Sequence, residues 1–112
     1  KSRAVFNGKV LVRQDAQRTN AFQMNRNLLL SSDAEIDTKP ELQIDADDVK
    51  CSHGASVGQL DAMQIFYLQS RGIKRDDAVR VLSEAFAVEA LNQIEDPVVR
   101  ERLKHLAREA MA

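Results

Sequence analysis

The hydrophobic pattern divides the chain into a strand-like first half and a helix-like second half. In residues 34–38 and 41–46, apolar and polar positions alternate with period two, which is typical of strands with one buried face. Lys39-Pro40 between them indicates a corner. We therefore predict short strands without intervening helices over residues 1–57.

Three further stretches of this first half show other patterns. Asn7-Gly8 lies between two strand-prone runs and is typical of a tight turn. The polar residues 15–26 predict a loop or a short helical turn, whereas the apolar run Leu28–Leu30 predicts a strand buried on both faces. Short strands separated by corners fit a sandwich, a small barrel or the stacked rungs of a β-helix.

From about residue 60 the apolar spacing becomes helical. Asp61 is the expected N-cap of a first helix, and Gly72 is the expected left-handed residue after its end. A second helix should begin near Arg75, and Asp96-Pro97 predicts the start of a third. Residues 58–112 therefore read as a small domain of about three helices.

Composition narrows the class of protein. The chain has 112 residues and a net charge of -1, so no bulk charge attracts nucleic acid or anionic lipid. No apolar run is long enough to span a membrane. A single cysteine cannot form an internal disulfide, which fits a reducing compartment such as the cytoplasm. Because the chain starts at Lys1 without a methionine, it looks like a piece of a longer polypeptide.

The chemistry of the chain is concentrated at Cys51 and His53. If their segment is extended, side chains two positions apart leave the same face of the strand and can converge on one ligand. A four-coordinate metal site would need two more ligands, which no neighbouring Cys or His supplies. The alternatives are a buried thiol beside a hydrogen-bonded histidine and a thiol hydrolase dyad, although no third orienting group supports the dyad.

Two other polar features read as surface. Asp45, Asp47 and Asp48 lack the twelve-residue ligand pattern of a calcium loop, so a solvated corner is expected. His105 lies late in the last helix, where a cation near the C-terminal end is ordinary. Neither feature predicts a binding site.

Three blocks of the sequence resemble one family. Residues 25–31 (NRNLLLS), 46–55 (ADDVKCSHGA) and 64–73 (QIFYLQSRGI) look like the C-terminal part of the SufB/SufD family of iron-sulfur cluster assembly proteins. The blocks occur in the family's order. SufB-like sequences tend to carry a glutamate directly after the histidine of the second block, where this chain has Gly54, so the SufD branch is favoured.

The resemblance implies a fold and a function. The expected fold is α+β: residues 1–57 form the end of a right-handed parallel β-helix, and residues 58–112 form the C-terminal helical domain. The expected function is that of a non-catalytic subunit of a bacterial, cytoplasmic assembly complex, which pairs with SufB and docks the SufC ATPase. No cofactor is expected to be permanently bound.

The resemblance also implies where the functional residues lie. His53 and Cys51 would hold a transient iron or iron-sulfur cluster at the interface with SufB, which would supply the missing ligands. Tyr67 and Arg71 would belong to the docking surface for SufC, since tyrosine and arginine are frequent interface anchors. Phe66, with Leu82 and Phe86 of the second helix, is instead expected in the helical core.

Other functions remain open from the sequence. A SufB-like scaffold subunit is one alternative, and a β-rich module that forms homo-oligomers is another. A truncated β-helix would expose a strand edge with unpaired backbone groups, so a homodimer of the isolated fragment is also expected. A thiol enzyme would instead require a reactive Cys51 and turnover by the chain alone.

Overall fold

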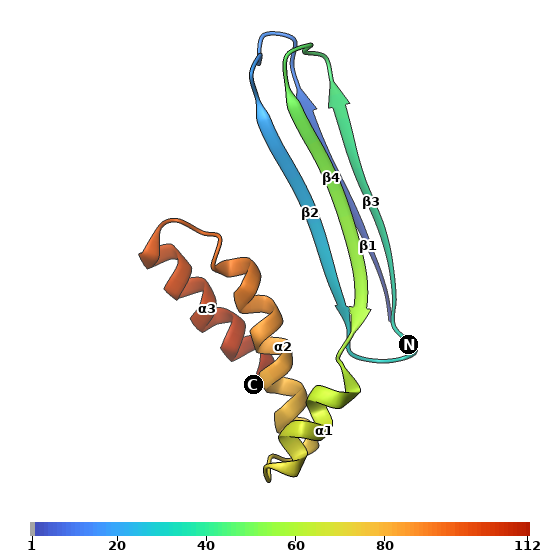
Figure 1. Ribbon diagram of the computed structural model, residues 1–112, viewed down its shortest axis with the longest axis vertical. Coiled ribbons are helices and arrows are strands. Elements are labelled where there is room, and N and C mark those ends of the chain that lie inside the picture. Colours follow the sequence, from blue (N-terminus) through green and yellow to red (C-terminus); the bar gives the residue numbers. More distant parts are fainter. Residues whose placement is uncertain (1) are drawn as a thin grey trace. The chain divides into compact units, whose positions relative to one another are not determined.

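The fold consists of four strands followed by three helices (Figure 1). The computed structural model describes residues 2–112. The strands are β1 (Arg3–Val12), β2 (Asn20–Leu29), β3 (Glu35–Ile44) and β4 (Lys50–Gln59), and the helices are α1 (Ala62–Ser70), α2 (Arg75–Leu91) and α3 (Pro97–Met111). They form two compact units, Lys1–Gln59 and Leu60–Ala112. The α+β class predicted from the sequence is thus confirmed.

The four strands form two separate parallel sheets of two strands each. β1 pairs with β3, and β2 pairs with β4, so the chain alternates between the sheets as it advances (Figure 1). Ala4 pairs with Ile36, 32 positions further along, and Ala21 pairs with Cys51, 30 positions further along. Each strand therefore returns to the one formed about 30 residues earlier.

The corners between strands are also stacked on one another. The backbone N–H of Asp45 donates to the carbonyl of Val12 at 2.8 Å, and that of Lys50 donates to the carbonyl of Thr19 at 2.9 Å. The side chain of Gln17 accepts from the backbone N–H of Asp48 at 2.9 Å. Backbone groups that a corner would leave without partners are therefore satisfied by the next corner. The acidic residues at positions 45, 47 and 48 are exposed there, as predicted.

One face of each sheet is turned toward the other sheet. Val12 is only 3% exposed, and Phe6 and Val10 on the same side of β1 are half-buried. Thr38 of β3 donates its hydroxyl to the Oδ1 of Asn25 of β2 at 2.7 Å, which links the two sheets directly. The interior of the β unit is therefore a thin layer containing both apolar and amide side chains.

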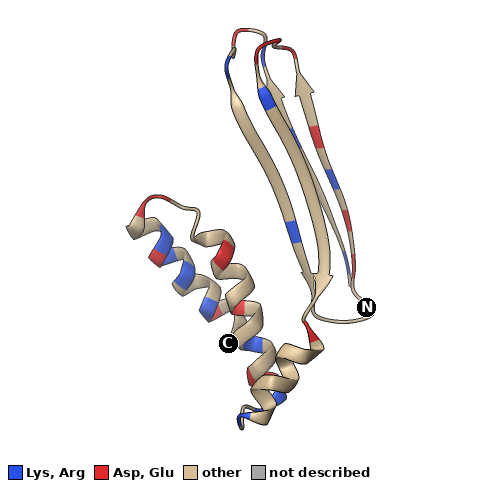
Figure 2. Cartoon of the chain, viewed as in Figure 1, with Lys and Arg blue, Asp and Glu red and all other residues tan. Residues whose placement is uncertain are grey.

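The opposite face of the β1–β3 sheet carries charge. Arg3 pairs with Asp37, and Nζ of Lys39 lies 3.0 Å from Oε1 of Glu41. Charged positions of both signs follow one another along β3 (Figure 2). The hydrogen bond from Lys39, and then its charge, lower the pKa of Glu41. By contrast, β2 and β4 each contain one charged residue, Arg26 and Lys50. The first sheet is thus solvated on its outer face, while the second has a largely uncharged outer face.

Two turns predicted in the first half are wrong. Asn7-Gly8 lies inside β1, and Lys39-Pro40 lies inside β3, where Gly8 and Pro40 are register partners. A Cβ added at Gly8 would lie 2.2 Å from Nε2 of Gln23, so this glycine gives space to a side chain rather than making a turn. Proline is tolerated in β3 because strands with one paired edge need fewer N–H donors.

The prediction for the polar stretch was also wrong in its second half. Residues 20–26, expected as loop or helical turn, belong to β2. The alternation is present but inverted, because the half-buried Gln23 and Asn25 face inward while Phe22 and Met24 are exposed. The strand expected at Leu28–Leu30 is found for Leu28 and Leu29, which are half-buried at successive positions, but it is not fully buried, and Leu30 lies beyond β2 and is 63% exposed.

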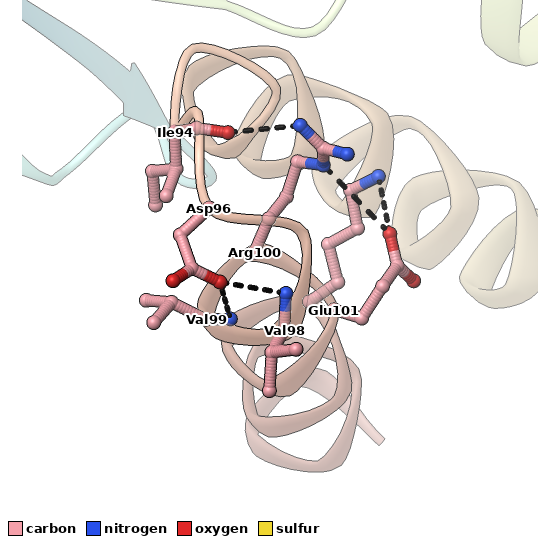
Figure 3. Close-up of polar contacts among 7 residues, drawn as sticks. Ile94, Asp96, Val98, Val99, Arg100 and Glu101 are labelled. Atoms are coloured by element: carbon pink, nitrogen blue, oxygen red, sulfur yellow. Dashed lines mark hydrogen bonds and ion pairs between the residues drawn. The ribbon is translucent and has the colours of Figure 1, made fainter.

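The helix boundaries follow the predicted caps. Asp61 accepts from the N–H of Met63 at 2.8 Å at the start of α1, and Gly72 has φ of +88° after its end. Asp96 accepts from the N–H groups of Val98 and Val99 at 2.8 and 3.1 Å, with Pro97 as the first residue of α3 (Figure 3). Local cap chemistry therefore determines where these helices begin.

The helical unit has a small core. Ala78 is fully buried, and Ser83 is buried with its hydroxyl donating to the carbonyl of Val79 at 2.7 Å. Across α2 and α3, Arg108 forms an ion pair with Glu84. Among residues 2–112, no helix is long and apolar enough to cross a membrane.

Candidate functional site

Cys51 and His53 lie on the same side of β4. The strand is extended, as the sequence argument required, and Cys51 pairs in register with Ala21 while His53 pairs with Gln23. Paired residues of a parallel sheet point to the same face. Because Gln23 approaches Gly8 of the other sheet, Cys51 and His53 lie on the inward face. Ser52, between them, lies on the opposite face of the strand.

The two candidate ligands differ in exposure. The Cys51 thiol is free and half-buried, whereas His53 is exposed. Within residues 2–112, no group of three or more His, Cys, Asp or Glu side chains is placed to hold a metal ion. This part of the chain therefore brings at most two ligands to a metal or cluster at β4, and a four-coordinate site would require others.

A row of amides lines the inward face of β2 beside this pair. Oδ1 of Asn25 accepts from the Thr38 hydroxyl and from Nδ2 of Asn27, both at 2.7 Å. The Asn27 amide also donates to the carbonyl of Ser56 at 3.2 Å, which joins β2 to β4. Gln23 belongs to the same row. These amides were not predicted as an inward row from the sequence, although their strict alternation with Phe22, Met24 and Arg26 could have indicated it.

Gly54 follows His53 on the outer face of β4. A Cβ at this position would lie 3.1 Å from Cε and 3.4 Å from Sδ of Met24, its register partner on β2. The end of the Met24 side chain, which is 49% exposed, would have to give by a few tenths of an ångström to admit this Cβ.

The predicted docking residues meet on α1. The guanidinium carbon of Arg71 lies 5.1 Å from the centre of the Tyr67 ring, a cation–π arrangement at the end of the helix. Tyr67 is 55% exposed, and its neighbours Met63 and Phe66 are 70% and 64% exposed. The expectation that Phe66 builds the helical core is therefore wrong. We refer to Met63, Phe66, Tyr67 and Arg71 as the α1 surface.

The third helix shows a second exposed apolar row. Val98, Val99, Leu103 and Leu106 are all exposed. The long polar side chains of Arg100 and Lys104 are instead partly covered. Arg100 donates to the carbonyl of Ile94 at 2.9 Å (Figure 3), and Lys104 pairs with Glu101 at 3.2 Å. His105 lies on the surface beside Glu109 at 3.3 Å, as predicted.

Comparison with known proteins identifies the family. The family model "SUF system FeS cluster assembly, SufBD core domain" matches residues 1–86, which is more than half of the chain. This chain belongs to the SufBD family. The region that carries Cys51, His53 and the α1 surface lies inside the match.

Individual SufBD relatives agree with this assignment. The SufBD family protein slr0076 of Synechocystis is 59% identical over 92% of this chain, and the protein SufD of Escherichia coli is 50% identical over 92%. SufD of Bacillus subtilis is 39% identical over 89% of the chain. The chain spans about a quarter of the length of these curated relatives, between 23% and 24%.

Proposed function

We propose that this chain is the C-terminal part of a SufD-type subunit in an iron-sulfur cluster assembly complex, and that it acts without catalysing a reaction. Its β unit would be the last two rungs of a right-handed parallel β-helix. The parallel pairing of β1 with β3 and of β2 with β4, with a repeat of about 30 residues, supports this reading. The similarity to proteins named SufD supports the choice of subunit. We place the complex in the bacterial cytoplasm, since a single free cysteine suits a reducing compartment.

The observation that carries the proposal is that Cys51 and His53, a soft and a borderline metal ligand, lie on the same face of β4. A thiolate binds iron-sulfur species well, and an imidazole binds iron and releases it more readily. Cys51 and His53 share one face, and no third His, Cys, Asp or Glu among residues 2–112 is placed to form a metal-holding group with them, so the site would be completed by a partner subunit of the SufB type. Incomplete coordination suits a cluster that is cargo and must be passed on.

The test of this site is cluster assembly in the complete complex. His53→Ala should sharply reduce the visible absorbance of the cluster after anaerobic reconstitution with SufB and SufC, because one of two local ligands is removed. His105→Ala is the matched control, since this second histidine lies on the surface of α3. Equal absorbance for the two variants would refute the role given to His53.

The α1 surface is the site where we propose that the SufC ATPase docks. Its aromatic and arginine side chains are of the types that dominate interface energies, and they are already exposed and arranged together. Tyr67→Ala should weaken SufC binding by about tenfold or more in a titration with the complete subunit. Val5→Ala is a suitable control because Val5 is exposed on β1 instead. Unchanged SufC affinity of the Tyr67 variant would exclude this docking surface.

A further inference from the structure

Helix α3 packs on α2 with its long polar side chains and leaves its apolar row uncovered. Its half-buried positions recur every three to four residues: Arg100, Lys104, Ala107 and Met111. The ion pair between Arg108 and Glu84 of α2 lies on the same side of the helix, so this side faces α2. Only 16% of the Lys104 side chain and 30% of the Arg100 side chain are exposed, as expected of side chains whose aliphatic stems are buried.

The apolar row on the adjacent side of α3 has the spacing of a coiled-coil seam. It comprises Val99, Leu103, Leu106 and Ala110, which are d, a, d and a positions of a heptad. Val99 is 47% exposed, Leu103 36% and Leu106 43%. Ala110 is exposed as well. We refer to these four residues as the α3 seam, an apolar row along the helix that stays accessible to solvent in the helical unit.

Two opposite charges border the α3 seam on the side away from α2. Arg102 and Glu109 are exposed and lie seven positions apart, so they occupy equivalent g positions of the heptad. Glu109 lies 3.3 Å from His105 of its own helix, a pair in which the histidine is charged only when it is protonated. The border of the seam is therefore positive near the start of the helix and negative near its end.

The α3 seam is complementary in size to a second copy of itself. When two copies of α3 lie antiparallel, a positions face d positions across the interface. Leu103 of each copy then faces Leu106 of the other, and the larger Val99 faces the small Ala110. Such a contact is related by a two-fold axis, so it closes on itself as a dimer.

The charges at the border select the antiparallel orientation. In the antiparallel pair, g positions meet across one side of the seam, so Arg102 of each copy lies beside Glu109 of the other. Two ion pairs of opposite charge result. In a parallel pair, each g position lies instead beside an e position of the other helix, which here places Arg102 beside the uncharged Ala107. Charge complementarity therefore favours a second copy of α3 in reversed direction.

We propose that the α3 seam is a self-association surface, on which α3 of a second copy of the same polypeptide packs in antiparallel orientation. The contact is short, since α3 has 15 residues, so the dimer is weak and depends on concentration. It differs from a dimer formed through strand edges, which would not involve α3. It also goes beyond the proposed function and does not depend on it.

The test is self-association of the complete subunit, measured by sedimentation velocity over a range of concentrations at low ionic strength, where exposed charges are screened least. Arg102→Glu brings like charges together at both ion pairs and should weaken the dimer about tenfold or more. Glu109→Arg should weaken it by a similar factor, although it changes the net charge in the opposite direction. Arg13→Glu reverses an exposed arginine directly after β1, and as the matched control it should change nothing.

Mixing the two weakened variants distinguishes pairing of α3 from a general effect of charge. When one Arg102→Glu copy lies antiparallel to one Glu109→Arg copy, both border contacts again join opposite charges. The mixture should therefore form a heterodimer with an affinity similar to that of the wild-type dimer. Both reversals on one chain should restore the homodimer for the same reason. Either rescue also shows that the variants are folded.

Three outcomes would overturn the proposal. The first is a wild-type subunit that stays monomeric at every concentration. The second is a dimer that neither reversal weakens, which would indicate another surface such as a strand edge. The third is a mixture of the two variants that associates no better than each variant alone. None of these results bears on cluster assembly or SufC docking, which are tested at His53 and Tyr67.

Discussion

Replacing Gly8 with alanine measures how tightly the interior of the β unit is packed around Gln23. The backbone of Gly8 has no positive φ, so alanine alone should favour the strand by about 0.5–1 kcal/mol. The added Cβ would however lie 2.2 Å from Nε2 of Gln23 and 2.8 Å from two ring atoms of Phe6. Carbon contacts are comfortable at roughly 3.5–4.0 Å, so both side chains must move.

The expected net effect is a loss of stability. Overpacking of this kind costs about 1–3 kcal/mol, which exceeds the gain from the strand backbone. Gly8→Ala should therefore lower the free energy of unfolding by about 1–2 kcal/mol. The assay is urea unfolding of the chain followed by far-ultraviolet circular dichroism, with the midpoint and slope compared with those of wild type.

Gly58 provides the matched control for this measurement. It also lies in a strand, β4, but a Cβ there would meet no atom within 4 Å. Gly58→Ala should accordingly stabilise the chain by about 0.5–1 kcal/mol. A Gly8 variant as stable as the Gly58 variant would refute the packing argument. Combining Gly8→Ala with Gln23→Ala should recover part of the loss, because the closest clash is removed.

Three further predictions concern caps and charge. Asp96→Ala removes the acceptor for two N–H groups at the start of α3 and should cost about 1 kcal/mol, seen as a lower thermal midpoint of the helical signal. Gly72→Ala forces a side chain into the left-handed region and should cost about 1 kcal/mol in the same assay. Lys39→Met should raise the pKa of Glu41 toward its ordinary value in a carboxyl NMR titration, because the hydrogen bond and charge that lower it are removed. Since this pKa is lowered by folding, the Lys39–Glu41 pair contributes above the ordinary carboxyl pKa and loses its contribution as the pH falls through the lowered value.

The helical half was predictable because its signals are local. Residues that begin or end a helix affect the backbone within one turn of their own positions. Each such residue has its predicted role: Asp61, Gly72 and Asp96-Pro97. The prediction that was wrong in this half is the burial of Phe66, whose side chain is 64% exposed. A periodic apolar pattern indicates which residues share a helix face, but it does not say whether another element covers that face.

The β half was less predictable because its determinants are distant in sequence. Gly8 resembles a turn residue until Gln23, 15 positions later, is seen to occupy the space beside it. The strand β2 was not predicted because amide side chains occupy its inward face, which is normally apolar. The spacing of Cys51 and His53 predicted a shared face correctly. The neighbour of His53 could not be predicted, because the sequence does not reveal the register between β2 and β4.

The parallel pairing of strands about 30 residues apart also bears on the order of folding. Every strand pair in the β unit closes a loop of 30 or 32 positions before its first ladder hydrogen bond forms. Loop closure of this kind slows folding, and proteins dominated by such distant pairings fold in about milliseconds to seconds, whereas helical bundles fold in about microseconds to milliseconds. The helices of residues 60–112, whose contacts are local, therefore form first. In refolding, Cys51 and His53 gain their neighbours Ala21 and Gln23 on the inward face only when β4 pairs with β2.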